Sequence, residues 1–116
     1  MGDILYKICT EAAFAEARSM GRFEGSEDDT SDGFIHLSAQ HQLPGTLAKH
    51  FAGRSGLLLL AIDPQTLGDA LRWEPSRGGA LFPHLYGPLD LATLLSVETL
   101  PLGQDGSHRL PSGVVA

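Results

Sequence analysis

The feature that most constrains the fold is an unbroken run of apolar residues, Leu57–Ile62. The run is closed by Asp63 and Pro64, so it has the length of a strand and is too short for an ordinary helix. Because no polar residue interrupts it, both faces of such a strand must be buried. We therefore expect a central strand in a sheet that is covered on both sides.

Two segments have the pattern of helices that could cover this sheet. Residues 11–20 are dense in strong helix formers, and Thr10 before them is a typical N-cap. In residues 39–52, large apolar side chains recur at helical spacing from Leu43 to Phe51, which predicts one buried stripe. We expect one helix in each segment.

Shorter segments predict the remaining elements. Alternating or clustered apolar residues are typical of strands in residues 5–9, 34–38, 71–74 and 96–102. Residues 22–33 are rich in acidic side chains and nearly devoid of apolar ones, so we expect a solvated loop there.

Composition places these elements in one small domain. The 116 residues include 14 Gly and 7 Pro, so the chain is rich in turns and its elements are short. We expect a single α+β domain over residues 1–102, with a central, mostly antiparallel sheet and two helices. Residues 103–116 show no periodicity, which predicts a poorly ordered C-terminal tail.

Charge and hydropathy exclude several classes of function. The formal net charge of −6 repels polyphosphate backbones, which argues against general nucleic-acid binding. No apolar run is long enough to span a membrane, and the first residues lack the basic and apolar regions of a signal peptide, so we expect a cytoplasmic protein without a membrane partner. The single Cys9 rules out a disulfide framework and a multi-cysteine metal site, and we expect it to be a small buried side chain.

Two histidines, His36 and His84, are the strongest candidates for chemistry. Each lies between apolar neighbours, where an imidazole must find a hydrogen-bond partner or face a cleft. In an extended backbone His36 shares its face with Ser38, and His84 shares its face with Tyr86. These pairs predict one shared polar pocket, and loss of His36 is then expected to affect function more than folding. A structural histidine satisfied within the core is the alternative for either residue.

Other chemistry has less support from the spacing. His36 and His41 are the only near neighbours among the histidines before the tail, which is too few ligands for a zinc site. The side chain of Ser38 would lie roughly 7 Å from that of His36 along one strand face, and no Gly-x-Ser-x-Gly turn is present, so a serine hydrolase is disfavoured. Glu74 fits either a general base or a surface ion pair with a neighbouring arginine.

Four blocks of sequence carry a resemblance to a known family. They are GFIHLS at 33–38, LLLAID at 58–63, RWE at 72–74 and FPHLYGPL at 82–89. In these blocks, and over about residues 4–102, the chain resembles a bacterial family of unknown function, number 952.

That family is similar, more remotely, to the ADP-ribosyltransferase superfamily. The superfamily includes RNA 2′-phosphotransferases, whose strand motif also has a His followed by an apolar residue and Ser. The resemblance implies a split, mostly antiparallel sheet and a cleft that binds or cleaves an NAD- or ADP-ribose-containing ligand. It implies no required cofactor, with NAD as a substrate. A non-catalytic small-molecule or protein interaction module is the alternative class.

The resemblance also assigns roles to individual positions. His36 and Glu74 take the catalytic positions. The ligand-binding positions are Lys7, Ser38, His84 and Tyr86. Lys7 stands where the family often has His, which argues against a ribose contact at that position and leaves a phosphate contact open. Glu74 and Glu98 both remain candidates for the transferase glutamate of the superfamily.

Overall fold

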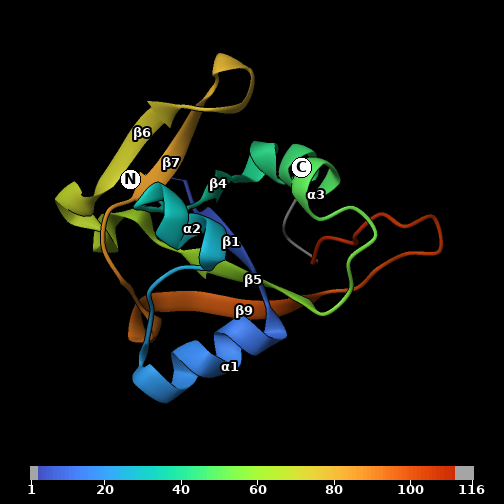
Figure 1. Ribbon diagram of the computed structural model, residues 1–116, viewed down its shortest axis with the longest axis horizontal. Coiled ribbons are helices and arrows are strands. Elements are labelled where there is room, and N and C mark those ends of the chain that lie inside the picture. Colours follow the sequence, from blue (N-terminus) through green and yellow to red (C-terminus); the bar gives the residue numbers. More distant parts are fainter. Residues whose placement is uncertain (1–2, 112–116) are drawn as a thin grey trace.

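Leu57–Ile62 forms strand β5 inside a four-stranded antiparallel sheet, and all of its residues are buried, as the apolar run predicts (Figure 1). The strand order is β4-β1-β5-β9, in which the other members are Leu5–Thr10 (β1), Ser38–Ala39 (β4) and Leu94–Leu100 (β9). The computed structural model describes residues 3–111, apart from the side chain of Arg77.

Helices cover both faces of this sheet. Helix α1 (Glu11–Met20) begins after Thr10, whose hydroxyl accepts a hydrogen bond from the backbone N–H of Ala13, and it ends at Gly21. It packs against the face that carries Leu58 and Leu60. Helix α3 (Leu43–His50) packs against the opposite face. The two predicted helices are therefore confirmed, except that residues 40–42 form a 3-10 turn and α3 starts at Leu43.

A second sheet stands beside the first. It has three antiparallel strands in the order β3-β7-β6, which span Ile35–His36 (β3), Leu81–Leu85 (β7) and Leu71–Pro75 (β6). A separate two-stranded pair joins Arg22–Phe23 (β2) to Leu89–Asp90 (β8). Trp73 in β6 is 47% exposed, so the alternating pattern of residues 71–74 identifies the strand but does not show that its apolar face is buried.

The strand predicted over residues 34–38 is divided between the two sheets. β3 pairs with β7, whereas β4 pairs with β1. Leu37 lies between them, and its backbone N–H donates to the carbonyl of Pro83 at 3.0 Å. The chain thus passes from one sheet to the other within a few residues, which gives an α+β domain with antiparallel, separated sheets.

The loop predicted over residues 22–33 is wrong. Besides β2, this segment contains a third helix, α2 (Glu27–Asp32). The carboxylate of Asp29 accepts a hydrogen bond at 2.9 Å from the backbone N–H of Ser26, the residue before the helix, as in a capping box. The negative charges at positions 27–29 also interact favourably with the positive end of the helix dipole. The acidic composition that indicated a loop therefore stabilises the first turn of a short helix.

The segment after β9 returns to the domain. Leu102 forms a β-bridge with His108, and the ring of His108 contacts the carbonyl of Arg54 at 2.6 Å. Residues 112–116 lie outside the described residues, so the poorly ordered tail stays a prediction. In residues 3–111, none of the helices has the length and apolarity that crossing a bilayer would require.

Candidate functional site

A cavity of about 740 Å³ lies among β1, α2, the β3–β4 segment and α3. Its volume is in the range of small-molecule sites. Four of the predicted site residues line it together, namely Lys7, His36, Ser38 and His84. His36 and His84 are directly opposed in the β3–β7 pair, and their ring centroids are 5.7 Å apart. The structure therefore brings together the two histidines that the strand patterns singled out.

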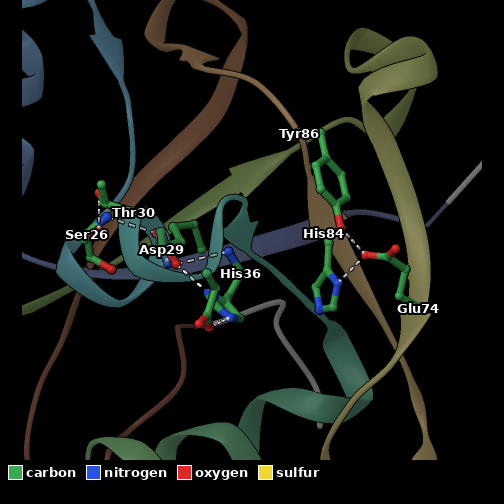
Figure 2. Close-up of polar contacts among 9 residues, drawn as sticks. Ser26, Asp29, Thr30, His36, Glu74, His84 and Tyr86 are labelled. Atoms are coloured by element: carbon green, nitrogen blue, oxygen red, sulfur yellow. Dashed lines mark hydrogen bonds and ion pairs between the residues drawn. The ribbon is translucent and has the colours of Figure 1, made fainter.

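One side of the cavity is organised by Asp29, a carboxylate that is only 2% exposed (Figure 2). Its Oδ1 accepts from the backbone N–H of His36 at 3.1 Å and contacts the imidazole Nδ1 at 2.6 Å. Its Oδ2 pairs with Lys7 Nζ at 2.8 Å. Asp29 thus connects α2 to β1 and β3, and sequence reasoning missed it. The Ser26-x-x-Asp29 spacing of a capping box was the signal that could have identified it.

His36 is surrounded by carboxylates on both ring nitrogens. Nδ1 contacts Asp29, and Nε2 lies 2.9 Å from Oδ2 of Asp32, one helical turn further along α2. The hydrogen bond to Asp29 raises the pKa of His36, although partial burial opposes this. Such surroundings favour the imidazolium form, and they occupy both nitrogens within the protein itself.

Asp29 is held in its charged form by the same contacts. Burial by itself would raise the pKa of this carboxyl group, but the hydrogen bond from His36 and the ammonium group of Lys7 outweigh burial and place the pKa far below its ordinary value. The ammonium of Lys7 is therefore engaged in a buried ion pair, although Lys7 lines the cavity.

The other side of the cavity is built on the β6–β7 pair. Oε1 of Glu74 lies 2.8 Å from Nδ1 of His84 and accepts from the hydroxyl of Tyr86 at 2.7 Å (Figure 2). These two hydrogen bonds lower the pKa of Glu74, and the bond to the carboxylate raises the pKa of Tyr86. Glu74 and Tyr86 are not among the residues that line the cavity. They are connected to it by the contact between Glu74 and His84. The i and i+2 placement of His84 and Tyr86 on one side is confirmed.

Phe34 holds the aromatic side chains of the site in place. Its ring stacks on His84 with a centroid distance of 4.0 Å and an interplanar angle of 25°. It also contacts the rings of His36 at 4.7 Å and Tyr86 at 5.3 Å. The predicted strand over residues 34–38 puts Phe34 on the same face as His36, but the sequence alone did not indicate that the ring of Phe34 would contact His84.

Ser38 and Cys9 are both buried in the wall of the cavity. The hydroxyl of Ser38 lies 3.1 Å from that of Thr46 on α3. Cys9 is a free thiol, and burial raises its pKa to about 11. The prediction that Cys9 is a small buried side chain is confirmed.

The charges that line the cavity differ between its walls. Helix α2 contributes the carboxylates of Asp28 and Asp32. The end of α3 and the loop after it contribute His50 and Arg54, and the guanidinium of Arg54 lies 5.5 Å from the ring centroid of Phe51. The cavity therefore has an acidic wall at α2, and Arg54 contributes a positive charge near the end of α3. Within residues 3–111, no three His, Cys, Asp or Glu side chains are arranged to hold a metal ion.

Comparison with known proteins identifies a family and a solved relative. The family described as "Protein of unknown function (DUF952)" matches residues 8–97. The crystal structure of protein CC0527 from Caulobacter crescentus is 48% identical, with a TM-score of 0.87 over 91% of this chain and 93% of that one. The solution NMR structure of CC0527 is 49% identical, with a TM-score of 0.81 over 90% of each chain. No curated protein matches the chain.

Proposed function

The chain belongs to the DUF952 protein family, and we propose that its cavity binds an NAD- or ADP-ribose-containing ligand, in the manner of the ADP-ribosyltransferase superfamily that the sequence remotely resembles. The observation that carries the proposal is the convergence of His36, Ser38 and His84 in a cavity of about 740 Å³ that is also lined by carboxylates of α2 and by Arg54. The separated antiparallel sheets are consistent with the split sheet that the resemblance implies.

The charge distribution suits this class of ligand. NAD carries a positive nicotinamide ring at one end and a negative pyrophosphate in the middle. The carboxylates of Asp28 and Asp32 favour a cation, and the guanidinium of Arg54 favours a phosphate.

The same cavity supports cleavage of the ligand as the finer proposal. Breaking the bond between ribose and nicotinamide develops positive charge on the ribose, and carboxylates near the reacting carbon stabilise that charge. Following the resemblance, we propose His36 and Glu74 as the catalytic residues and Lys7, Ser38, His84 and Tyr86 as ligand contacts. A turnover assay on NAD separates an enzyme from a binding protein.

Titration of ¹⁵N-labelled protein with NAD, ADP-ribose and nicotinamide tests binding. We expect the amide signals of His36 and His84 to shift with at least NAD or ADP-ribose. Arg54→Ala should weaken ADP-ribose binding by about tenfold, the effect of losing one charge-assisted hydrogen bond. Arg18→Ala removes the same charge from the exposed side of helix α1, outside the cavity lining, and should leave binding unchanged. No shift with any of the three compounds would refute the proposal.

An interaction module is the second candidate, and one observation favours it. Trp73 and Leu81 are 47% and 52% exposed on the β6–β7 pair. Exposed aromatic and aliphatic side chains are typical anchors of protein interfaces. If the three compounds leave the spectrum unchanged, the second candidate becomes the better description of the protein.

A further inference from the structure

The two histidines in the cavity differ in what their ring nitrogens can offer a ligand. Both nitrogens of His36 face carboxylates of α2, namely Asp29 and Asp32. Only Nδ1 of His84 has a partner among the described side chains, and this partner is Glu74. Figure 2 shows the other nitrogen of His84 pointing away from Glu74. Since His84 lines the cavity, Nε2 of His84 is the imidazole nitrogen that a ligand can reach.

The partner on Nδ1 determines the chemical character of Nε2. The carboxylate of Glu74 can only accept hydrogen bonds when it is ionised, and it already accepts one from the hydroxyl of Tyr86. Its contact with Nδ1 at 2.8 Å therefore requires a proton on Nδ1. In a neutral imidazole the proton on Nδ1 leaves Nε2 with a lone pair, so Nε2 is a hydrogen-bond acceptor.

The surroundings hold the imidazole of His84 in this orientation. The ring is stacked on Phe34 at 4.0 Å, and the residue is only 4% exposed. The hydroxyl of Tyr86 fixes the same carboxylate oxygen that contacts Nδ1. A ring that is held by stacking on its face and by a carboxylate on its edge presents Nε2 in one direction only.

From this geometry we infer that His84 contacts the ligand as a hydrogen-bond acceptor for one of its hydroxyl groups, and that Glu74 and Tyr86 are positioning residues that act through His84. The inference rests on the proposed function for the class of ligand, because the ribose units of NAD and ADP-ribose supply such hydroxyls. It gives Glu74 a different task from the catalytic one that the resemblance implies. It also makes His36 a support of the cavity wall.

The protonation pattern can be measured without any ligand. Long-range ¹H–¹⁵N spectra of the histidine side chains at pH 7.5 should show the proton of His84 on Nδ1. In Glu74→Ala the proton loses the acceptor that holds it there, so Nε2 should carry the proton in a larger fraction of molecules. Glu16→Ala is the matched control, because Glu16 is exposed on helix α1 and does not line the cavity. An unchanged pattern in Glu74→Ala would overturn the positioning role.

Titration with ADP-ribose then tests the ligand contact. We expect the Nε2 signal of wild-type His84 to shift on binding. The dissociation constant should rise about tenfold in Glu74→Ala and more in His84→Ala, and it should stay unchanged in Glu16→Ala. His84→Gln, which can place an amide oxygen near the position of Nε2, should recover part of the affinity lost in His84→Ala.

The outcomes separate this inference from the proposed function. If ADP-ribose binds but the His84 Nε2 signal does not move and Glu74→Ala binds equally well, the inference is wrong and the proposed function stands. If neither ADP-ribose nor NAD binds, the proposed function is wrong and with it the ligand contact of His84. The spectra without ligand still decide whether Glu74 positions the ring in that case.

Discussion

Lys7 and Asp29 form a buried ion pair, in which Nζ and Oδ2 are 2.8 Å apart and the two side chains are 7% and 2% exposed. Lys7 belongs to strand β1 and Asp29 to helix α2, so the pair joins the main sheet to the acidic wall of the cavity. The same carboxylate also holds His36. The stability of the domain and the shape of the cavity therefore depend on one charge network.

Removing the charge of Asp29 should destabilise the domain strongly. Asp29→Asn leaves Lys7 buried without a counter-charge, and breaking a buried pair in this way costs about 3–5 kcal/mol. For a domain of this size, thermal unfolding should occur at least about 10 °C lower. Asp28→Asn is the matched control, since Asp28 is exposed on the same helix. Similar melting temperatures for the two variants would contradict the prediction that the buried charge of Asp29 stabilises the domain.

Stability should depend on pH in two opposite ways. The pKa of His36 is raised in the folded protein, mainly by its hydrogen bond to Asp29. The stability that His36 contributes is therefore fully present below its pKa in the unfolded chain, about 6.5, and is lost as the pH rises through its pKa in the folded protein. The pKa of Asp29 is lowered in the folded protein. The stability that Asp29 contributes is therefore fully present above its pKa in the unfolded chain, about 3.9, and is lost as the pH falls through its pKa in the folded protein.

The free energy of unfolding should therefore be greatest between about pH 4 and 6.5, as measured by urea unfolding across the pH range. The groups that face His36 are Asp29, Asp32, Lys7 and the ring of His84. His36→Ala should remove most of the decline on the alkaline side. A decline of the same size in that variant would mean that another group is responsible.

The cost of losing His36 distinguishes a support of the fold from a free functional side chain. The strand pattern predicts that His36→Ala spares folding. The contacts with Asp29 predict instead a loss of roughly 1–3 kcal/mol, because a buried carboxylate loses a partner. Ile35→Ala provides a core reference, with an expected loss of about 2–5 kcal/mol. Chemical denaturation of both variants measures the two losses in the free energy of unfolding. No measurable loss for His36→Ala would support the strand-pattern prediction that this variant spares folding.

The thiol of Cys9 should be unreactive in the folded protein. Burial raises its pKa to about 11, so the thiolate is scarce at pH 7.5, and the side chain is only 3% exposed. A disulfide reagent such as DTNB should label Cys9 slowly in buffer and rapidly in denaturant. Rapid labelling of the folded protein would show that the cavity admits the reagent to this residue.

Several elements of this protein follow from its sequence by itself. The apolar run of Leu57–Ile62 predicts β5, and the helix formers that follow Thr10 predict α1 with the observed ends. The alternation around His36 and His84 predicts that these residues share a pocket. Each of these predictions depends on hydrogen bonds and side-chain periodicity within a few consecutive residues, which the order of residues specifies directly.

Only the tertiary structure decided what these side chains do. The carboxylate of Asp29 in α2 can be buried because Lys7 of β1 and His36 of β3 contact it from other elements. Glu74 binds His84 because β6 pairs with β7. A buried charge is stable only where a partner from another segment compensates its lost hydration, and the local pattern does not contain that partner. The occupied nitrogens of His36 and the open nitrogen of His84 are consequences of how the two sheets and α2 are packed.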